Sequence, residues 1–118
     1  MSNKVLGDRG ESCAARYLGA QGYRILAQKY RTKIGEIDLI AKDRDTLVFV
    51  EVKTRRSVRC GFPAEAVNYR KQRKIIQTAM WYLREKQMDQ TPCRFDIVEV
   101  YAAGSEWRIH HLKGAFEV

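Results

Sequence analysis

GEIDLIAKDRDTLVFVEVKTRR, residues Gly35 to Arg56, contains two runs rich in Val, Ile, Leu and Phe on either side of the sequence DRDT. Such runs predict strands over 35–41 and 46–54, and DRDT predicts the turn of a hairpin. The strands also carry four ionisable residues among the aliphatic ones: Glu36, Asp38, Glu51 and Lys53. An ionisable group held near a core needs a partner or acquires a shifted pKa, so these charges are candidates for a site.

The register of the hairpin decides whether these charges meet. A turn at the centre of DRDT places Asp38 opposite Glu51 and Glu36 opposite Lys53. Successive side chains alternate between the two faces of a strand, so all four residues then share one face. A slip of one residue would scatter the cross-strand pairs without changing the alternation within each strand. We therefore expect one aliphatic face, and one face that is polar at the end away from the turn.

Asp38 and Glu51 would repel each other across the hairpin unless a positive charge lies between them. Mg²⁺ binds hard oxygen ligands and usually takes only one or two carboxylates. The two carboxylates and the backbone carbonyl of Val52 could therefore form half of its coordination shell. Lys53 would then orient a water molecule or offset charge on a phosphate. The alternative is a surface ladder of ion pairs, each worth about 0 to 1 kcal/mol.

The remaining elements are predicted from their end signals and apolar patterns. A first helix is expected over 7–22, with Asp8 as its N-cap and Glu11 completing a capping box. A second helix is expected from Pro63 to about Lys86. Further strands are expected over 23–31, 93–102 and 107–113. The order α-β-β-β-α-β-β predicts an α/β fold in which helices flank one mixed β-sheet.

The chain has 118 residues, a length that suits a single domain over residues 1–118. Its net charge is +8, and the stretch from Lys53 to Lys74 holds eight basic residues against one acid. A basic segment of this kind attracts polyanions, although it can also be an ordinary solvated helix face. The residues expected to bind nucleic acid are Arg55, Arg56, Arg59, Arg70, Lys71, Arg73 and Lys74.

Membrane and disulfide-rich classes are not indicated. No apolar stretch approaches the roughly 18 to 20 residues of a membrane span, and no secretory signal is evident, so a cytoplasmic protein is expected. The three cysteines form no CxxC pair that would indicate a zinc site. His110 and His111 could indicate a metal ligand or a general base, but neighbours on a predicted strand face opposite sides and cannot easily share one metal. We therefore expect surface or edge-strand placement for them. Asp96 lies among apolar neighbours, and nothing in the sequence directs it to the site.

Glu11, Asp38 and the run Glu51-Val52-Lys53 together resemble the D, E-x-K core of the PD-(D/E)XK nuclease superfamily. A closer resemblance, to the YraN-type family of small bacterial predicted endonucleases, covers essentially the whole chain. The segments that carry it are G-x-x-G-E-x-x-A (7–14), GEIDLIA (35–41), VFVEVKTR (48–55), PAEAV with the following K-Q (63–72), RFDIV (94–98) and the closing Ala115-Phe116.

The resemblance implies a restriction-endonuclease-like fold, which the Holliday-junction resolvases of archaea share. It implies that Asp38 and Glu51 are ligands of Mg²⁺ or Mn²⁺ and that Lys53 is the catalytic lysine. It also implies that Glu11 is an accessory acid that reaches the metal from the first helix.

We therefore expect a metal-dependent endonuclease that hydrolyses phosphodiester bonds by water attack, with DNA favoured over RNA and branched or single-stranded substrates favoured over others. A homodimer would supply the two sites that cutting both strands requires. Gln77 and Trp81 have the spacing of a Gln and an aromatic residue on the corresponding helix of some nuclease branches, and packing is the other explanation for them. The alternatives are a catalytically weak or inactive nucleic-acid-binding module on a nuclease scaffold, and a protein-interaction domain.

Overall fold

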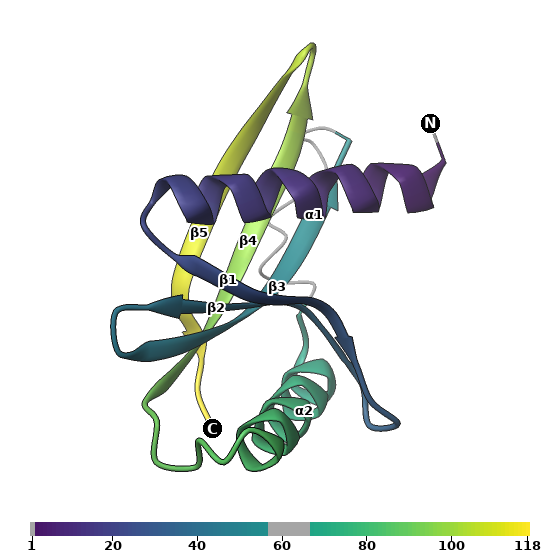
Figure 1. Ribbon diagram of the computed structural model, residues 1–118. Helices are drawn as coiled ribbons and strands as arrows, with labels where there is room; N and C mark the ends of the chain where they lie inside the picture. The colour runs from purple at the N-terminus through teal and green to yellow at the C-terminus, as the bar shows by residue number, and fades with distance from the viewer. Residues whose placement is uncertain (1, 57–66) are drawn as a thin grey trace.

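The computed structural model describes residues 2–56 and 67–118. Its elements are α1 (Asn3–Ala20), β1 (Arg24–Arg31), β2 (Glu36–Asp43), β3 (Thr46–Arg55), α2 (Tyr69–Glu85), β4 (Cys93–Ala103) and β5 (Glu106–Phe116). This order, drawn in Figure 1, confirms the predicted α/β fold with the order α-β-β-β-α-β-β. Within these described ranges, no helix is long and apolar enough to cross a membrane.

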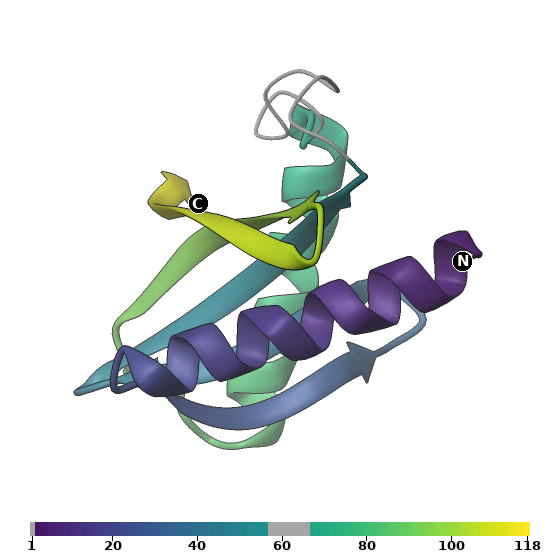
Figure 2. The same ribbon diagram turned by 90° about the horizontal axis from the view of Figure 1, so that it is seen from above.

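The five strands form one mixed sheet in the order β1-β2-β3-β4-β5. Strands β3 and β4 are parallel, and the other neighbours are antiparallel. The chain crosses from β3 to β4 by way of α2, as a parallel connection requires. The sheet lies between α1 and α2, and Figure 2 shows the two helices on opposite sides of it. Each face of the sheet therefore has its own core and its own polar groups.

Strand β3 is buried on both faces, and its side chains alternate between the two cores. Val48, Val50 and Val52 pack in the cluster that includes α1. Leu47 and Phe49 pack in the cluster that includes α2. The period of two along a strand produces this division. Glu51 follows Phe49 by two residues and therefore points to the α2 side.

The predicted hairpin register is confirmed near the turn, where the ladder runs from Leu39 paired with Val50 to Asp43 paired with Thr46. Asp38 and Glu51 lie just past the last pair of this ladder. There the N–H of Val52 donates to Oδ2 of Asp38 at 2.8 Å instead of to the backbone of β2. The two strands separate at this point, because a side chain has replaced the main-chain contact.

Both helices begin at different residues from those predicted. Ser2 is the N-cap of α1, and its hydroxyl accepts the N–H of Val5 at 3.1 Å, so the assignment of Asp8 as N-cap and of Glu11 to a capping box was wrong. Asn68 is the N-cap of α2, with an extended backbone, so the helix does not run continuously from the Pro63 region. Pro63 itself lies outside the described residues. Hydrogen-bonding side chains next to the first helical N–H groups fix both starts.

Gly10 brings α1 into close contact with β3. A Cβ atom at this position would lie 2.0 Å from Oγ1 of Thr54 and 2.9 Å from its Cβ. Any larger side chain would therefore push the helix away from the strand. Glu11, the next residue, is carried toward the sheet by this close approach.

Candidate active site

The candidate site lies where β2 and β3 separate. Asp38 extends from β2 into the gap, and its Oδ2 accepts the N–H of Val52 at 2.8 Å. The N–H and C=O of one strand residue point to the same side of the strand, so the Val52 carbonyl is directed toward the same gap. Glu51, only 6% exposed, precedes Val52 on β3. The three predicted ligand groups thus come from one small region at the end of the hairpin ladder.

Two lysines neutralise Glu51. Nζ of Lys71 lies 2.7 Å from Oε1 of Glu51, and Nζ of Lys53 lies 3.5 Å from the same oxygen. Lys71 is in the first turn of α2, where its own N–H donates to the N-cap Asn68 at 2.9 Å. The start of α2 therefore brings a cation from a distant part of the sequence to the predicted acid pair.

Among residues 2–56 and 67–118, Asp38 forms no ion pair, and the pKa of its carboxyl group rises to about 7. Burial is the largest cause, because desolvation disfavours the charged form, and the negative charge of Glu51 is the second. The N–H of Val52 opposes these effects, whereas the charges of Glu11 and Glu36 add to them. Four acids therefore interact at this edge of the hairpin, and one of them is poised to gain or lose a proton near neutral pH.

Burial lowers the pKa of Lys53, and the neighbouring ammonium group of Lys71 lowers it further, against the opposing charge of Glu51. For Lys71, burial alone would lower the pKa, but its hydrogen bond to Glu51 outweighs burial and the pKa is raised. The two lysines therefore differ in character. Lys71 is a firmly charged partner of Glu51, and Lys53 is the lysine more able to exchange a proton with a bound water.

Glu11 lies on α1 and accepts from Nζ of Lys29 at 3.0 Å. The same ammonium group also binds Asp8 at 3.0 Å, so Lys29 joins the helix to β1. Lys29 has a positive φ of 52°, a conformation that few residues other than glycine adopt. The structure places Glu11 near enough for its charge to raise the pKa of Asp38, and it holds the Glu11 side chain with a lysine that the sequence did not single out.

The predicted nucleic-acid-binding residues do not all share one environment. Arg70 and Lys74 are exposed on α2, while Lys71 and Arg73 are partly buried. Arg55 ends β3, and Arg56 donates to Oδ1 of Asn3 at 2.8 Å. Arg59 lies outside the described residues. The assignment of Lys71 to a phosphate-binding surface missed its contact with Glu51, which depends on packing between elements that are distant in sequence.

A metal ion can be tested against the donor atoms present. Within residues 2–56 and 67–118, no group of three or more His, Cys, Asp or Glu side chains is arranged to hold a metal. Two carboxylates and a main-chain carbonyl nevertheless fit Mg²⁺ or Mn²⁺, because these ions keep waters or substrate oxygens in the rest of the shell. The short contact of Lys71 shows that Glu51 already accommodates a cation. The donor set at Asp38, Glu51 and Val52 therefore fits a hard divalent ion.

Asp96 and His111 lie on the other face of the sheet, away from Glu51. His111 is on β5, an edge strand of the sheet, as expected. Its side chain is nevertheless only 4% exposed and lies 2.7 Å from Oδ2 of the fully buried Asp96, so the ring is not at the surface. His110, with 56% of its side chain exposed, follows the prediction. The opposite orientations of the two rings were predictable from the strand period, but the cover that α1 provides over His111 was not.

Gln77 and Trp81 are both exposed on α2, so core packing does not explain their spacing. Trp81 borders a shallow cavity beside the connection between β1 and β2. Met80 is also exposed, whereas Ile75 and Tyr82 fill the core positions of the helix. The buried stripe of α2 follows Ile75, Tyr82 and their neighbours, which leaves Gln77 and Trp81 on the exposed side.

Comparisons with known proteins agree with the resemblance seen in the sequence. The model of the "Uncharacterised protein family UPF0102" matches residues 10–100. A UPF0102 protein of Clostridioides difficile strain 630 is 47% identical over 116 residues, which cover 98% of this chain and 100% of the relative. A UPF0102 protein of Symbiobacterium thermophilum is 54% identical over 100 residues, covering 85% of this chain and 84% of the relative. The chain therefore belongs to the UPF0102 family, the YraN-type family to which its motifs point.

Proposed function

We propose that the protein is a metal-dependent endonuclease that hydrolyses phosphodiester bonds of DNA. The observation that carries the proposal is the pair of buried acids at the end of the β2–β3 ladder. Glu51 has lysine partners, whereas burial and the charge of Glu51 raise the pKa of Asp38 to about 7. Groups with strongly shifted pKa values beside convergent charges are typical of catalytic sites. A divalent cation bound between the two carboxylates would relieve their mutual repulsion.

Asp38, Glu51 and the carbonyl of Val52 are the groups that would hold Mg²⁺ or Mn²⁺. When bound, such an ion supplies Lewis acidity, which lowers the pKa of a coordinated water and offsets charge on the phosphate. Lys53 orients the attacking water and, with its lowered pKa, exchanges a proton with it. Lys71 provides positive charge beside the scissile phosphate from the start of α2.

The role of Glu11 is to add negative electrostatic potential at the Asp38 carboxyl group. Its carboxylate shares Lys29 with Asp8, so Glu11 stays on the sheet side of α1. Its charge favours the protonated form of Asp38 in the absence of a metal and the metal-bound form in its presence. We assign it as the accessory acid of the site.

The basic residues around α2 would hold the DNA backbone. Arg70 and Lys74 lie one turn apart on its exposed side, and Lys71 lies between them at the acid pair. Six phosphate contacts with B-DNA would give a slope of about −5 in log K against log salt concentration. Phosphate contacts carry no base sequence information, so the shape of the nucleic acid is the expected basis of selection.

A second function is favoured by one specific observation, the 2.7 Å ion pair between Lys71 and Glu51. If this pair stays closed when nucleic acid binds, the lysine occupies the place of the cation. The protein would then be a nucleic-acid-binding module that keeps the scaffold of a nuclease without useful turnover. The two functions share the basic surface and differ in whether Glu51 exchanges Lys71 for a metal.

Cleavage of a panel of labelled DNAs distinguishes the two functions. The panel contains linear duplex, single-stranded, flapped and four-way-junction DNA, each with Mg²⁺, Mn²⁺ or EDTA. Wild type is compared with Asp38→Asn, Glu51→Gln and Lys53→Met, and Asp45→Asn in the exposed β2–β3 turn is the matched control.

The endonuclease predicts metal-dependent products from wild type and the control, and a loss of at least about a hundredfold in the three site variants with binding retained. Binding by all five proteins with no cleavage of any substrate would instead establish the binding module. Cleavage that survives in all three site variants would show that the chemistry lies elsewhere.

A further inference from the structure

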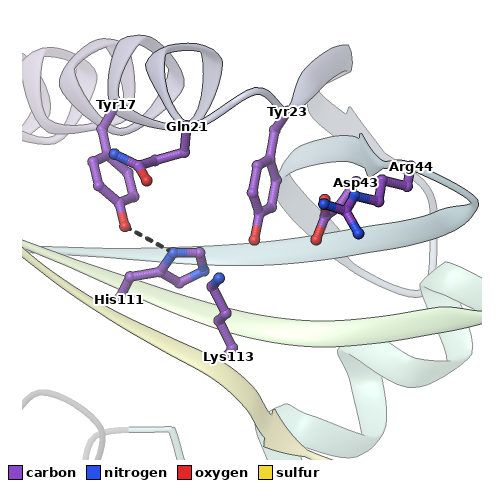
Figure 3. Close-up of a pocket in the computed structure, with 7 residues that line it drawn as sticks. All are labelled: Tyr17, Gln21, Tyr23, Asp43, Arg44, His111 and Lys113. Atoms are coloured by element: carbon purple, nitrogen blue, oxygen red, sulfur yellow. Dashed lines mark hydrogen bonds between the residues drawn. The ribbon is translucent and has the colours of Figure 1, made fainter.

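A polar cavity of about 340 Å³ lies on the α1 face of the sheet, the face opposite Glu51 and Lys71. Figure 3 shows side chains from three parts of the chain pointing into it: Tyr17 from α1, Tyr23 from the connection to β1, and His111 and Lys113 from β5. Arg44 borders it from the β2–β3 turn. None of these residues takes part in the proposed nuclease chemistry.

A fully paired acid lies behind His111, one of the residues that line the cavity. Asp96 is completely buried and receives hydrogen bonds from Arg94 at 2.9 and 3.0 Å, His111 at 2.7 Å and the N–H of Gly114 at 3.0 Å. Burial alone would raise the pKa of Asp96, but these hydrogen bonds outweigh it and hold the pKa below its ordinary value. Asp96 therefore stays charged and fixes the ring of His111 through Nε2. The other nitrogen, Nδ1, lies 3.0 Å from the hydroxyl of Tyr17.

The same acid shapes the strand that carries Lys113. Phe95 pairs with Phe116 and Ile97 with Leu112, so one residue of β4 stands opposite three of β5. The extra residues form a bulge, in which Gly114 adopts a φ of +60° and donates to Asp96. Bulges redirect side chains and occur often beside functional sites. Here the bulge directs Lys113 into the cavity, where its charge acts on the hydroxyl of Tyr17.

The charge balance of the cavity favours an anion. Its own acid, Asp43, lies 3.2 Å from Nη1 of Arg94, which also pairs with Asp96. Arg94 therefore offsets one of these two carboxylates, and with Arg44 and Lys113 the cations exceed the acids by one charge. Arg94 also donates to the Tyr23 hydroxyl at 2.7 Å, which leaves that oxygen's own proton free to point elsewhere. In the part of the chain that the structure describes, neither Lys113 nor Arg44 forms a side-chain ion pair. Two cations without carboxylate partners thus border a cavity that also offers the Tyr23 hydroxyl as a donor.

We propose that this cavity binds a phosphate monoester, at a site separate from the candidate active site. Lys113 and Arg44 bind the dianion, and the Tyr23 hydroxyl, whose oxygen accepts from Arg94, donates its proton to one of the phosphate oxygens. A volume of about 340 Å³ exceeds what a phosphate group alone fills, so the cavity also accepts the sugar or base attached to it, against the rings of Tyr17 and Tyr23. A free mononucleotide and the phosphorylated 5′ end of a DNA strand share this chemistry.

Calorimetric titration in EDTA tests the proposal without any contribution from a metal site. The probes are inorganic phosphate, deoxyadenosine 5′-monophosphate, and one short oligonucleotide with either a 5′-phosphate or a 5′-hydroxyl. Lys113→Gln and Arg44→Gln are compared with Arg108→Gln, an exposed basic residue on the same strand as Lys113. All three positions are exposed, so the variants are expected to keep the fold, and thermal unfolding checks that they do.

We expect the mononucleotide to bind wild type and Arg108→Gln equally, and each cavity variant about tenfold more weakly, as loss of a charge-assisted hydrogen bond implies. Tighter binding of the 5′-phosphorylated strand than of its 5′-hydroxyl form and of the mononucleotide would assign the strand end as the natural ligand. The reverse order would assign a free nucleotide.

Failure of every phosphate probe to bind at millimolar concentration would overturn the proposal, as would equal weakening in Arg108→Gln. Asp38→Asn separates this test from that of the nuclease, because the substitution should abolish cleavage and leave mononucleotide binding unchanged.

Discussion

Replacing Asp38 by Asn should stabilise the protein at high pH, although Asp38 is a proposed functional residue. Its carboxyl group has a pKa of about 7 instead of 3.8, so the folded state disfavours the charged form. Each factor of ten in proton affinity corresponds to about 1.4 kcal/mol, so ionised Asp38 destabilises the fold by up to about 4 kcal/mol above pH 7. Asparagine does not ionise, and its amide oxygen can still accept the N–H of Val52.

The sign of the pH dependence follows from proton binding. Between about pH 4 and 7 the folded state holds the Asp38 proton and the unfolded state releases it, so wild-type stability falls as pH rises through this window. Asp38→Asn has no side-chain proton to release at this position, so its stability does not fall in this way as pH rises. The two proteins should be equally stable near pH 4, and at pH 8 the variant should unfold about 10 to 15 °C higher.

Thermal and urea unfolding followed by circular dichroism, in EDTA from pH 4 to 8.5, measures this difference. Asp45→Asn is the control, because it removes an exposed acid from the nearby turn and should leave the pH profile of wild type unchanged. The reasoning is refuted if Asp38→Asn differs from wild type by the same amount at every pH. In a separate titration without EDTA, addition of Mg²⁺ should raise the unfolding temperature of wild type at pH 8 and leave that of Asp38→Asn unchanged.

Two further predictions concern the helices. Gly10→Ala should lower the free energy of unfolding by about 1 to 3 kcal/mol, because the new methyl group would overlap Thr54 of β3. Gly7→Ala has open space around it and should raise the free energy of unfolding by about 0.5 to 1 kcal/mol. Urea unfolding measures both, and equal effects would contradict the close approach of α1 to β3. Substitution of both Arg70 and Lys74 by Gln should reduce the magnitude of the slope of log K against log salt concentration for DNA binding by about 2. Arg16→Gln on α1 is the control and should leave this slope unchanged. An unchanged slope in the double variant would show that these residues of α2 do not contact DNA.

The sequence contained enough information for the order of elements and for the alternation of faces along β3. The same alternation places Ile37 on the face of Leu39, which is wrong, because Ile37 packs in the cluster that includes α2. Successive side chains of a strand alternate between its two faces, so the sequence of β3 alone places Glu51 and Lys53 on the face that its valines do not occupy. The register near the DRDT turn was predictable for the same local reason. The separation of β2 from β3 at Asp38 was not, because a side chain there takes a main-chain hydrogen bond.

Contacts between distant elements account for the other differences. Lys71 reaches Glu51 only because α2 starts at Tyr69, and that start depends on whether Asn68 or an earlier residue caps the helix. His111 looked like an edge residue, and β5 is indeed an edge strand, but Tyr17 on α1 covers its ring. Local patterns describe a residue's own element and do not show which other element will cover it.

The proposed function depends most directly on whether Asp38 and Glu51 bind a divalent cation, and calorimetric titration with Mn²⁺ at pH 6.5 measures this. With a pKa of about 7, Asp38 carries about three-quarters of a proton at this pH and must release it to become a ligand. Titrations in two buffers of different ionisation enthalpy should therefore show release of about 0.75 proton per Mn²⁺ by wild type, decreasing toward zero at pH 8.5. Binding should be lost in Asp38→Asn and Glu51→Gln. Absence of Mn²⁺ binding by wild type, or binding without proton release that persists in both variants, would contradict the assignment of this acid pair as the metal site of a nuclease.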